Sequence, residues 1–384
     1  MDRTERDLRI LEYMRSRQAD MVALIRRLVE LESPTSNKAA VDRMGTAVAD
    51  AAESVADVRR HPATDFGDHL RISFDIPSHR DGQVLGLGHI DTVWEIGTLR
   101  RMPWRHADGR YWGPGVFDMK AGVVYLLFAA FALRDLRIPT RRQFVVQLNS
   151  DEEVGSPTST VHTKREASCS AAVLVAEPSA GLDGRLKTAR KGGATYEVVV
   201  RGVPSHSGLD FTAGASAIGE LARQVSVVSR WTDLRTGITV NPGLIQGGTA
   251  PNVVAAEATA TFDVRFVTKG QAEAIDRRFR SLEPVDARCA IRVLGGTRKL
   301  PMERTPDVVG LFRTAQDIAK RMGVNLGEAS VGGGSDGNTT AAMGVPTLDG
   351  LGAVGEGAHS LNESILESRI ADRAALIAAL ASEL

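Results

Sequence analysis

The sequence predicts an α/β protein in which helices cover a mostly parallel β-sheet and a smaller α+β domain is inserted. Apolar runs that are typical of strands alternate with helical periodicity over residues 1–188. Near residue 190 the pattern changes to the order βαββαβ, and after residue 296 the earlier pattern returns. We therefore expect three segments, 1–188, 189–298 and 299–384, of which the first and third form one domain.

The first segment begins with helices. Apolar residues at helical spacing predict a helical stretch over 7–32, which ends before Ser33–Pro34, and a second helix over 40–56. Four strands and one buried helix follow, at 70–76, 83–90, 119–135 (the helix), 142–153 and 171–179. The second strand is nearly all apolar, as expected of a strand that is buried on both faces of a parallel sheet.

The inserted segment is predicted to contain four strands and two helices. In chain order these are strand 194–202, helix 213–229, strands 238–248 and 252–266, helix 271–282 and strand 290–294. This order is typical of a ferredoxin-like, split-βαβ domain. In the third segment, helices at 306–322 and 363–382 flank a glycine-rich loop, GGGSDG.

Composition limits the classes of function. The 47 basic and 47 acidic residues give a formal net charge of zero, and no basic run with interleaved aromatics indicates nucleic-acid binding. Cys169 and Cys289 have no partner at metal-motif spacing. The charged first ten residues lack an export signal, and the longest apolar stretch, 121–133, is shorter than the ~20 residues of a membrane span. We therefore expect a cytoplasmic protein that binds neither nucleic acid nor membrane.

Titratable side chains follow three of the predicted strands. His89 and Asp91 end the second strand, Glu152 and Glu153 the third, and Glu177 the fourth. Each alone has an ordinary structural explanation, such as a buried histidine or a turn residue. In an open α/β sheet, however, the carboxyl ends of the strands meet where ligands bind. Carboxylates gathered there with an imidazole repel one another unless a divalent cation lies among them, and these ligand types favour zinc, with cobalt or manganese as alternatives.

Two further features fit a metal site. Asp118 lies in a loop, GVFDMKAG, just before the buried helix, where it could also be an N-cap. His89 and Asp91 face the same way because they are two apart on a strand, and a metal-bound imidazole usually donates its other N–H to a carboxylate. A dinucleotide-binding motif explains GLGHID poorly, since Asp91 stands at the third glycine position. A P-loop explains GGGSDG poorly, because no Gly-Lys-Ser/Thr follows.

These motifs, in their order, resemble the M20 family of co-catalytic zinc metallopeptidases and deacylases, and most of all its glutamate carboxypeptidase (carboxypeptidase G) branch. From about residue 20 to the C-terminus they are HIDT, GVFDMKAG, SDEEVGS, AEPS, SHSG, GGTAPNVV, DVRF, GGGSDG and GAHS. The resemblance implies a phosphorylase/hydrolase-like catalytic domain formed by 1–188 and 299–384. It also implies that 189–298 is a lid and dimerisation domain.

The resemblance implies a role for each site residue. Two zinc ions would be held by five ligands, namely His89 and Glu177 on one ion, Glu153 and His359 on the other, and Asp118 as the bridge. Glu152 would be the general base and Asp91 would orient His89. The peptide bond between Asp118 and Met119 would be cis.

The inserted domain would supply further contacts. His206 would reach the active site of the other subunit of a homodimer and stabilise the oxyanion; without the resemblance it is equally well a surface histidine in a turn. Arg265 and Asn252 match residues that hold a substrate carboxylate, although Arg265 could also lie on the solvent face of a strand. The glycine-rich turn, with the backbone of Gly333, Gly334 and Ser335, could also receive a carboxylate.

We therefore expect a dinuclear zinc hydrolase that cleaves an amide bond next to a free carboxylate. Its substrate would be a small peptide, from which it releases a C-terminal, glutamate-like residue. Glu177 replaces an aspartate of several peptidase members, and glutamate is frequent there in deacylases, so a deacylase of N-acyl amino acids or of the succinyl-diaminopimelate type is the alternative. A non-catalytic binding protein on the same fold is a third candidate, disfavoured because Glu152 and all the ligands are present.

Overall fold

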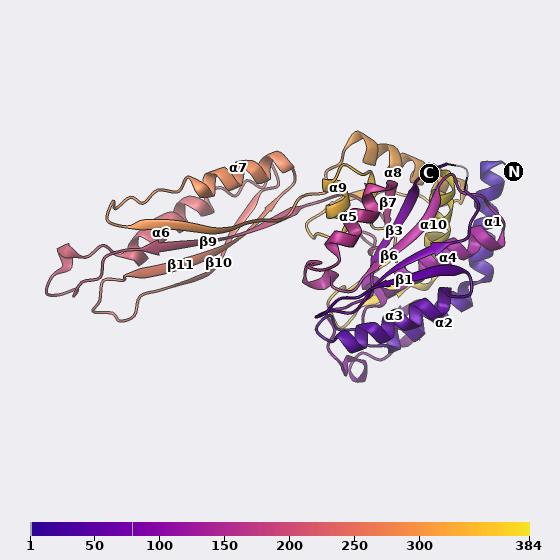
Figure 1. The fold of residues 1–384 in the computed structure, drawn as a ribbon, viewed down its shortest axis with the longest axis horizontal. Coiled ribbons are helices and arrows are strands. Elements are labelled where there is room, and N and C mark those ends of the chain that lie inside the picture. Colours follow the sequence, from indigo (N-terminus) through magenta and orange to yellow (C-terminus); the bar gives the residue numbers. More distant parts are fainter. Residues whose placement is uncertain (1, 79) are drawn as a thin grey trace. The chain divides into compact units, whose positions relative to one another are not determined.

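The computed structural model describes residues 2–78 and 80–384 (Figure 1). The chain divides into two compact units: the first comprises Met1–Thr188, Arg304–Val331 and Ser335–Leu384, and the second comprises Ala189–Glu303 and Gly332–Gly334. The second boundary lies at Glu303 rather than at residue 298, because Arg190 and Met302 pair across the two ends of the second unit.

The first unit is built on a six-stranded sheet. Its strands, in spatial order, are β1 (Ala56–His61), β2 (His69–Phe74), β6 (Gln143–Asn149), β3 (Gln83–His89), β7 (Ser170–Val175) and β14 (Thr347–Leu348). The pairings β6–β3, β3–β7 and β7–β14 are parallel, whereas β1–β2 and β2–β6 are antiparallel. The sheet is therefore mostly parallel, as the sequence predicted, with an antiparallel edge.

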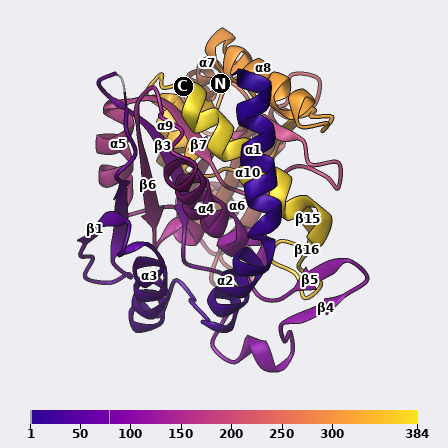
Figure 2. The same ribbon diagram turned by 90° about the vertical axis from the view of Figure 1, so that its right-hand side faces the viewer.

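Helices cover both faces of this sheet (Figures 1 and 2). They are α1 (Arg3–Ser16), α2 (Gln18–Glu30), α3 (Lys38–Ala52), α4 (Ala121–Asp135), α5 (Thr160–Ser168), α8 (Pro306–Arg321), α9 (Gly337–Ala342) and α10 (Ile370–Glu383). Helix α4 packs on β3 and β6 and lies against α10, which in turn contacts α1. Helices α5 and α9 contact β7 on the opposite face of the sheet, beside a smaller core that includes Leu85 and Val175.

The stretch Val116–Asp135 is long and apolar enough to cross a membrane, but most of it is buried inside the protein. The core helix of a soluble protein has the same properties, so this feature is weak evidence for a span.

Several predicted elements differ from the structure. The helical stretch 7–32 is two helices, because Arg17 leaves the helical conformation between α1 and α2. The helix predicted over 40–56 ends at Ala52, after which β1 begins. The last helix starts at Ile370, since Ser364–Leu366 forms β16, a strand paired with β5 (Arg110–Trp112). Helical periodicity does not reveal such short strands, whose stability comes from tertiary pairing.

Three further short strands lie in the first unit, β4 (Arg105–Ala107), β15 (Gly355–Glu356) and β13 (Glu328–Val331), and β8 (Leu186–Arg190) runs across the boundary at Thr188. Strands β15, β16, β5 and β4 form one small antiparallel sheet, and β13 pairs with β8.

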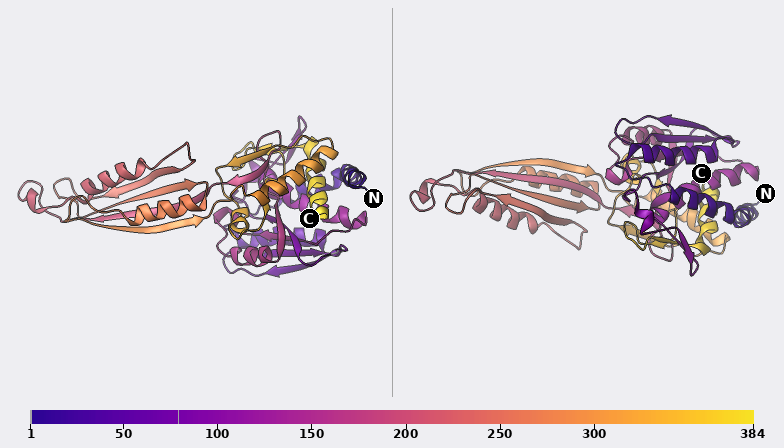
Figure 3. Two further views of the ribbon diagram at one scale, coloured as in Figure 1. Left: turned by 90° about the horizontal axis from the view of Figure 1, so that it is seen from above. Right: turned by 90° about the horizontal axis from the view of Figure 1, so that it is seen from below.

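The second unit, drawn from two sides in Figure 3, has the element order βαββαβ. Its elements are β9 (Gly192–Arg201), α6 (Ala217–Ser229), β10 (Thr239–Gly247), β11 (Glu257–Phe266), α7 (Lys269–Arg280) and β12 (Ala290–Lys299). The strands form an antiparallel sheet in the order β10-β11-β9-β12. Both helices share one core with alternate residues of β9, including Tyr196 and Val198, so they cover the same face.

Candidate active site

His89 is the last residue of β3 and is 2% exposed. A Cβ at the preceding Gly88 would lie 2.7 Å from Met119 Cε, so the glycine lets the loop that contains Asp118 pack directly on the strand. The Asp118–Met119 peptide bond is cis, as predicted. His89 Nδ1 lies 3.0 Å from the carbonyl oxygen of Asp91, to which it donates. This hydrogen bond leaves Nε2 as the nitrogen that faces the carboxylates.

Asp118 lies between two histidines. Its Oδ1 is 3.2 Å from His89 Nε2, and its Oδ2 is 3.5 Å from His359 Nε2. Each histidine has a second carboxylate beside it: Glu177 Oε1 is 3.6 Å from His89 Nε2, and Glu153 Oε2 is 3.2 Å from His359 Nε2. All five predicted metal ligands of the first unit therefore converge, in two half-sites that share Asp118.

The electrostatics of this cluster fit a divalent cation. Burial alone would lower the pKa of His89, but the carboxylates of Asp118 and Asp91 outweigh it and raise that pKa well above its ordinary value. Hydrogen bonding to Asp118 and Glu153 raises the pKa of His359 to about 10. The two imidazoles in turn hold the pKa of Asp118 below its ordinary value despite burial. A cation among these carboxylates would meet the same demand for positive charge.

Two further observations test whether these residues suit a metal. The ligand atoms of His89, Asp118 and Glu153 lie within 4.8 Å of one another, as do those of His89, Glu152 and Glu177. Glu153 Oε1 is buried and has no hydrogen-bond partner among the described residues. A buried carboxylate oxygen without a partner is costly, and coordination of a cation would satisfy it. The donor set of imidazole and carboxylate suits zinc and related metals.

Asp91 connects the carboxyl ends of the two strands, β3 and β6, that lead into the site. It is 1% exposed, and its carboxylate accepts the N–H groups of Glu152 and Glu153, each at 3.2 Å. The hydroxyl of Thr35 donates to the same carboxylate at 2.8 Å. Asp91 Oδ1 also lies 3.5 Å from His89 Nδ1. One buried carboxylate thus holds the turn that contains Glu152 and Glu153 next to His89.

Asp151, to which the sequence assigned no role, holds the same turn from the side of the protein interior. Its Oδ2 accepts the backbone N–H of Thr158 at 2.7 Å and that of Ser159 at 3.1 Å. Asp151 is fully buried. Of three consecutive acidic residues, Asp151 therefore faces the protein interior, while Glu152 and Glu153 face the cluster. The strand ends at Asn149 and Glu152–Val154 form a 3-10 turn, so strand alternation could not have separated the three.

Glu363 is a second residue that the sequence analysis missed. It is fully buried, and its carboxylate accepts N–H groups from the loop that contains Asp118. Burial raises the pKa of Glu363 to about 7, although these N–H donors oppose the shift. Its position four residues after His359 is the only sequence signal that points to it.

Three of the predicted site residues in the second unit are His206, Asn252 and Arg265, and of these the unit brings only His206 and Asn252 together. His206 forms a bridge with Val253, and the carbonyl of Asn252 accepts the N–H of Ser207, before β11 begins. Arg265 lies near the other end of β11. The eight residue steps along the strand from its start to Arg265 cover about 26 Å. One copy of the second unit therefore keeps His206 and Asn252 away from Arg265.

The glycine-rich turn is already engaged by the protein itself. The carbonyl oxygens of Gly333 and Gly334 accept Arg190 Nη1, at 3.1 Å and 3.2 Å. Ser335 is buried; its N–H donates to Asn338 Oδ1 at 3.0 Å and its hydroxyl donates to Asp349 Oδ2 at 2.6 Å. These contacts occupy Ser335, so a carboxylate would have to compete with Asn338 for its N–H.

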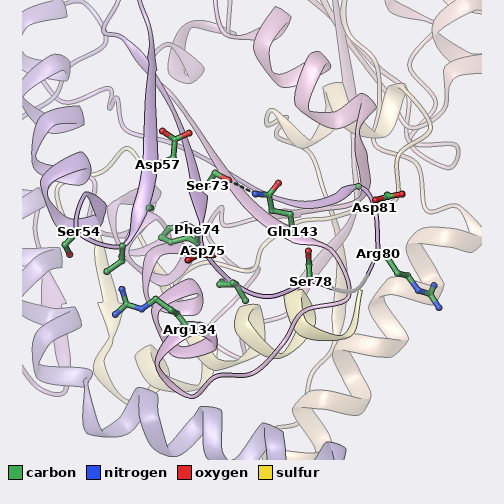
Figure 4. A pocket seen from close by; sticks show the side chains of 14 residues that line it. Ser54, Asp57, Ser73, Phe74, Asp75, Ser78, Arg80, Asp81, Arg134 and Gln143 are labelled. Carbon is green, nitrogen blue, oxygen red and sulfur yellow. Dashed lines mark hydrogen bonds between the residues drawn. The ribbon is translucent and has the colours of Figure 1, made fainter.

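A cavity of about 860 Å³ lies elsewhere in the first unit, beside β1 and β2 (Figure 4). Its wall includes Asp57, Asp75 and Arg134, and Gln143 donates to Ser73 there at 2.7 Å. None of the predicted site residues lines it. Cavity size alone therefore does not indicate the active site of this protein.

A histidine and glutamates at the carboxyl ends of parallel strands, joined by an aspartate and a second histidine from loops, are typical of metal-dependent hydrolases. The family model of peptidase family M20/M25/M40 matches residues 86–383, and the chain belongs to this family. The protein is thus a metal-dependent hydrolase that acts on peptide or related C–N bonds.

Relatives and solved structures agree with this assignment. Carboxypeptidase G2 of Pseudomonas sp. (strain RS-16) is 28% identical over 292 residues, which cover 72% of this chain and 68% of that protein. The succinyl-diaminopimelate desuccinylase of Paraburkholderia xenovorans is 27% identical over 313 residues, which cover 72% of this chain and 76% of that protein. A probable carboxypeptidase of Arthroderma otae is matched over only 63% of its length.

The structural likeness extends over nearly the whole chain. Aminopeptidase PepT from Bacillus cereus has a TM-score of 0.76 at 21% identity, covering 95% of this chain and 98% of that one. A dinuclear metal-binding M20 peptidase from Bacillus subtilis has a TM-score of 0.71 at 15% identity, covering 96% and 98%. At these identities the likeness shows the fold.

Proposed function

We propose that this protein is a dinuclear zinc hydrolase of the carboxypeptidase type, which cleaves an amide bond next to a free carboxylate. The observation that carries the proposal is the arrangement of Asp118 between His89 and His359, each with its own glutamate. When bound, two divalent cations supply the Lewis acidity that polarises a scissile carbonyl and lowers the pKa of the attacking water. The metals would be held by His89, Glu177, Asp118, Glu153 and His359.

Glu152 is suited to the proton transfers. Its backbone is fixed by Asp91, and its side chain faces the cluster beside His89 and Glu177. As general base, Glu152 would take a proton from the attacking water and then deliver it to the leaving amine. Its carboxylate is also close enough to His89 and Glu177 to be a ligand, so the experiment must separate the two roles.

Arg265 is suited to hold the substrate carboxylate. Its Nε and Nη2 donate to the two oxygens of Asp263, at 2.8 Å and 2.9 Å, which fixes the plane of the guanidinium. The side chain is 43% exposed, so the other edge of the fork can receive a carboxylate in the bidentate geometry that arginine favours. A Cβ at Gly193 would lie 3.3 Å from Arg265 Nη1, and the glycine leaves room for this group.

A homodimer through the second unit would supply His206 and Asn252 to the site of the partner subunit. The support is β10, an edge strand of the second unit's sheet whose last seven residues are exposed. Leu244 and Ile245 on this strand are 70% and 64% exposed. An exposed, apolar edge strand readily pairs with a second copy of itself.

A deacylase is the second candidate, favoured by Glu177 and by the similarity to a desuccinylase along 76% of that protein. Both candidates hydrolyse an amide beside a carboxylate, so they differ only in which side of the scissile amide bond carries the variable group. Rates on acyl-glutamate or folate-like substrates, compared with rates on N-acetyl and N-succinyl amino acids, discriminate them. Preference for a substrate without any free carboxylate would contradict the role of Arg265.

The central experiment combines metal removal with Glu152→Gln. We expect hydrolysis to stop after chelation and to return with Zn²⁺, Co²⁺ or Mn²⁺. Glu152→Gln should still bind two metal equivalents but lose at least about 10²-fold in kcat, as expected for removal of a general base. Glu356→Gln, which alters an exposed ion pair with Arg110, is the matched control and should behave as wild type. Chelator-resistant hydrolysis would reject the metallohydrolase, and loss of one metal in Glu152→Gln would make Glu152 a ligand.

A further inference from the structure

We propose that Glu363 is a positioning residue of the metal centre, which holds the Asp118 carboxylate between the two histidines without itself binding a metal. The inference rests on the proposed function, since it assigns a task to a residue beside the same site. It arises from the contacts of one buried side chain, which the proposed chemistry does not otherwise use.

The carboxylate of Glu363 accepts four hydrogen bonds, two on each oxygen. Oε1 accepts the backbone N–H groups of Phe117 and Asp118, both at 2.9 Å. Oε2 accepts the backbone N–H of Gly115 at 2.9 Å and the indole Nε1–H of Trp94 at 2.8 Å. Glu363 is fully buried. Its oxygens are therefore engaged by donors of the protein and are not offered to a cation.

These four contacts join three segments, and each segment carries a proposed metal ligand. Trp94 follows His89 by five residues, Gly115 to Asp118 form the loop before α4, and Glu363 follows His359 by four residues. A turn shortens the last connection, because the N–H of Glu363 donates to Ser360 O at 3.0 Å. One side chain thus fixes the relative position of the three segments that carry Asp118 and both histidines.

A carboxylate is the side chain that this position requires. All four partners are N–H donors, and an ionised carboxylate is the common side chain that only accepts hydrogen bonds. Glutamine has nearly the same shape, but its NH₂ would face two of the donors. Glu363→Gln therefore removes half of the acceptors with almost no change in volume, and it tests the hydrogen bonds rather than the packing.

The readout is metal binding, which is independent of turnover. Metal-free wild type and Glu363→Gln are titrated with Zn²⁺ against a chromophoric chelator, and with Co²⁺, whose visible absorption reports its coordination. Loss of an outer partner of a metal ligand typically weakens binding by about 10–100-fold. We expect a loss of this size and an altered Co²⁺ spectrum. The control is Glu367→Gln, four residues on, because Glu367 accepts from Tyr111 and His106 instead of the Asp118 loop. It should bind metal as wild type does.

A melting curve of the metal-free protein shows whether Glu363→Gln folds. A second variant tests the proposal if it does not. Trp94→Phe removes one of the four donors and keeps the three backbone contacts, so it should weaken binding by only a few-fold. Wild-type affinity and an unchanged Co²⁺ spectrum in a folded Glu363→Gln would overturn the proposal. If that variant does not fold, wild-type affinity in Trp94→Phe would overturn it. Failure of the proposed function would look different, because wild type itself would then bind no pair of metals.

Discussion

Asp91 Oδ1 accepts the backbone N–H of Glu152 at 3.2 Å, although 61 residues separate them in the chain. The same carboxylate lies 3.5 Å from His89 Nδ1. The residue beside a proposed metal ligand is therefore also the residue that holds the proposed general base. A change at Asp91 should disturb both the imidazole and the base.

Asp91→Asn is the variant that tests this coupling. Its amide NH₂ would replace one acceptor oxygen and face the N–H of Glu152 or Glu153. We expect kcat to fall by about 10–100-fold at saturating metal, with little change in KM, because substrate contacts are untouched. Thr35→Val is the control: it removes the 2.8 Å hydroxyl contact but keeps the carboxylate, and it should lose less. Wild-type kcat in Asp91→Asn would contradict the coupling.

Metal binding should raise the thermal stability of the protein. The cluster gathers Asp118, Glu153 and Glu177 around two imidazoles, and a cation bound only by the folded state stabilises that state. At a free metal concentration of about 100 Kd the gain is about 2.7 kcal/mol. Melting curves of chelated protein at increasing Zn²⁺ measure it, and His359→Ala should need more metal for the same shift. A melting temperature that does not depend on metal would argue against the site.

A histidine cluster outside the set of proposed metal ligands should make stability fall below neutral pH. His61 and His162 stack with ring centroids 4.3 Å apart, and the ring centroid of His69 lies 5.6 Å from that of His162. Burial lowers the pKa of all three. The charge of Arg165 adds to this at His61 and His162, and the charge of the neighbouring imidazoles adds to it at His61 and His69. The facing carboxylates of Asp151 and Glu166 oppose the shift, and Arg71 adds to it at His61.

The sign follows from proton linkage. Because the folded-state pKa values lie below 6.5, the unfolded chain binds these protons more readily, and the free energy of unfolding decreases as pH falls below about 6.5. Denaturant titrations between about pH 7.5 and 5.5 measure the slope. His162→Gln should reduce it, since one titrating ring and its repulsion of His61 are removed. A slope equal to that of wild type would exclude the cluster as its source.

The sequence revealed those parts of the site that depend on strand ends. His89 and Glu153 follow apolar runs, so their meeting at the edge of a parallel sheet could be predicted from the strand pattern alone. The bridging role of Asp118 and the assignment of His359 needed the family resemblance, because both residues lie in loops without periodicity. Glu363 was missed for a physical reason: it acts on backbone N–H groups about 245 residues away, and backbone donors leave no trace in side-chain patterns.

The elements of the fold likewise divide into those that the sequence predicted and those that it did not. Long elements with a clear period, such as α4 and β3, were predicted to within a few residues, because their burial dictates their composition. Short strands were not: β16 has three residues, and its pairing with β5 is a tertiary contact that overrides the helical pattern after residue 363. The break at Arg17 between α1 and α2 likewise has no glycine or proline to mark it.

The proposed dimer predicts that two inactive variants restore each other. In one copy of the second unit, His206 lies before the start of β11 and Arg265 near its end, so the partner subunit would have to provide His206. His206→Ala and Glu152→Gln should each be nearly inactive alone. In a mixed dimer, one of the two sites has both wild-type residues, so random re-association should recover about one quarter of the wild-type activity. Mixing two Glu152→Gln preparations is the control. No recovery, with mixed dimers detected by tagged co-purification, would mean that each subunit uses its own His206.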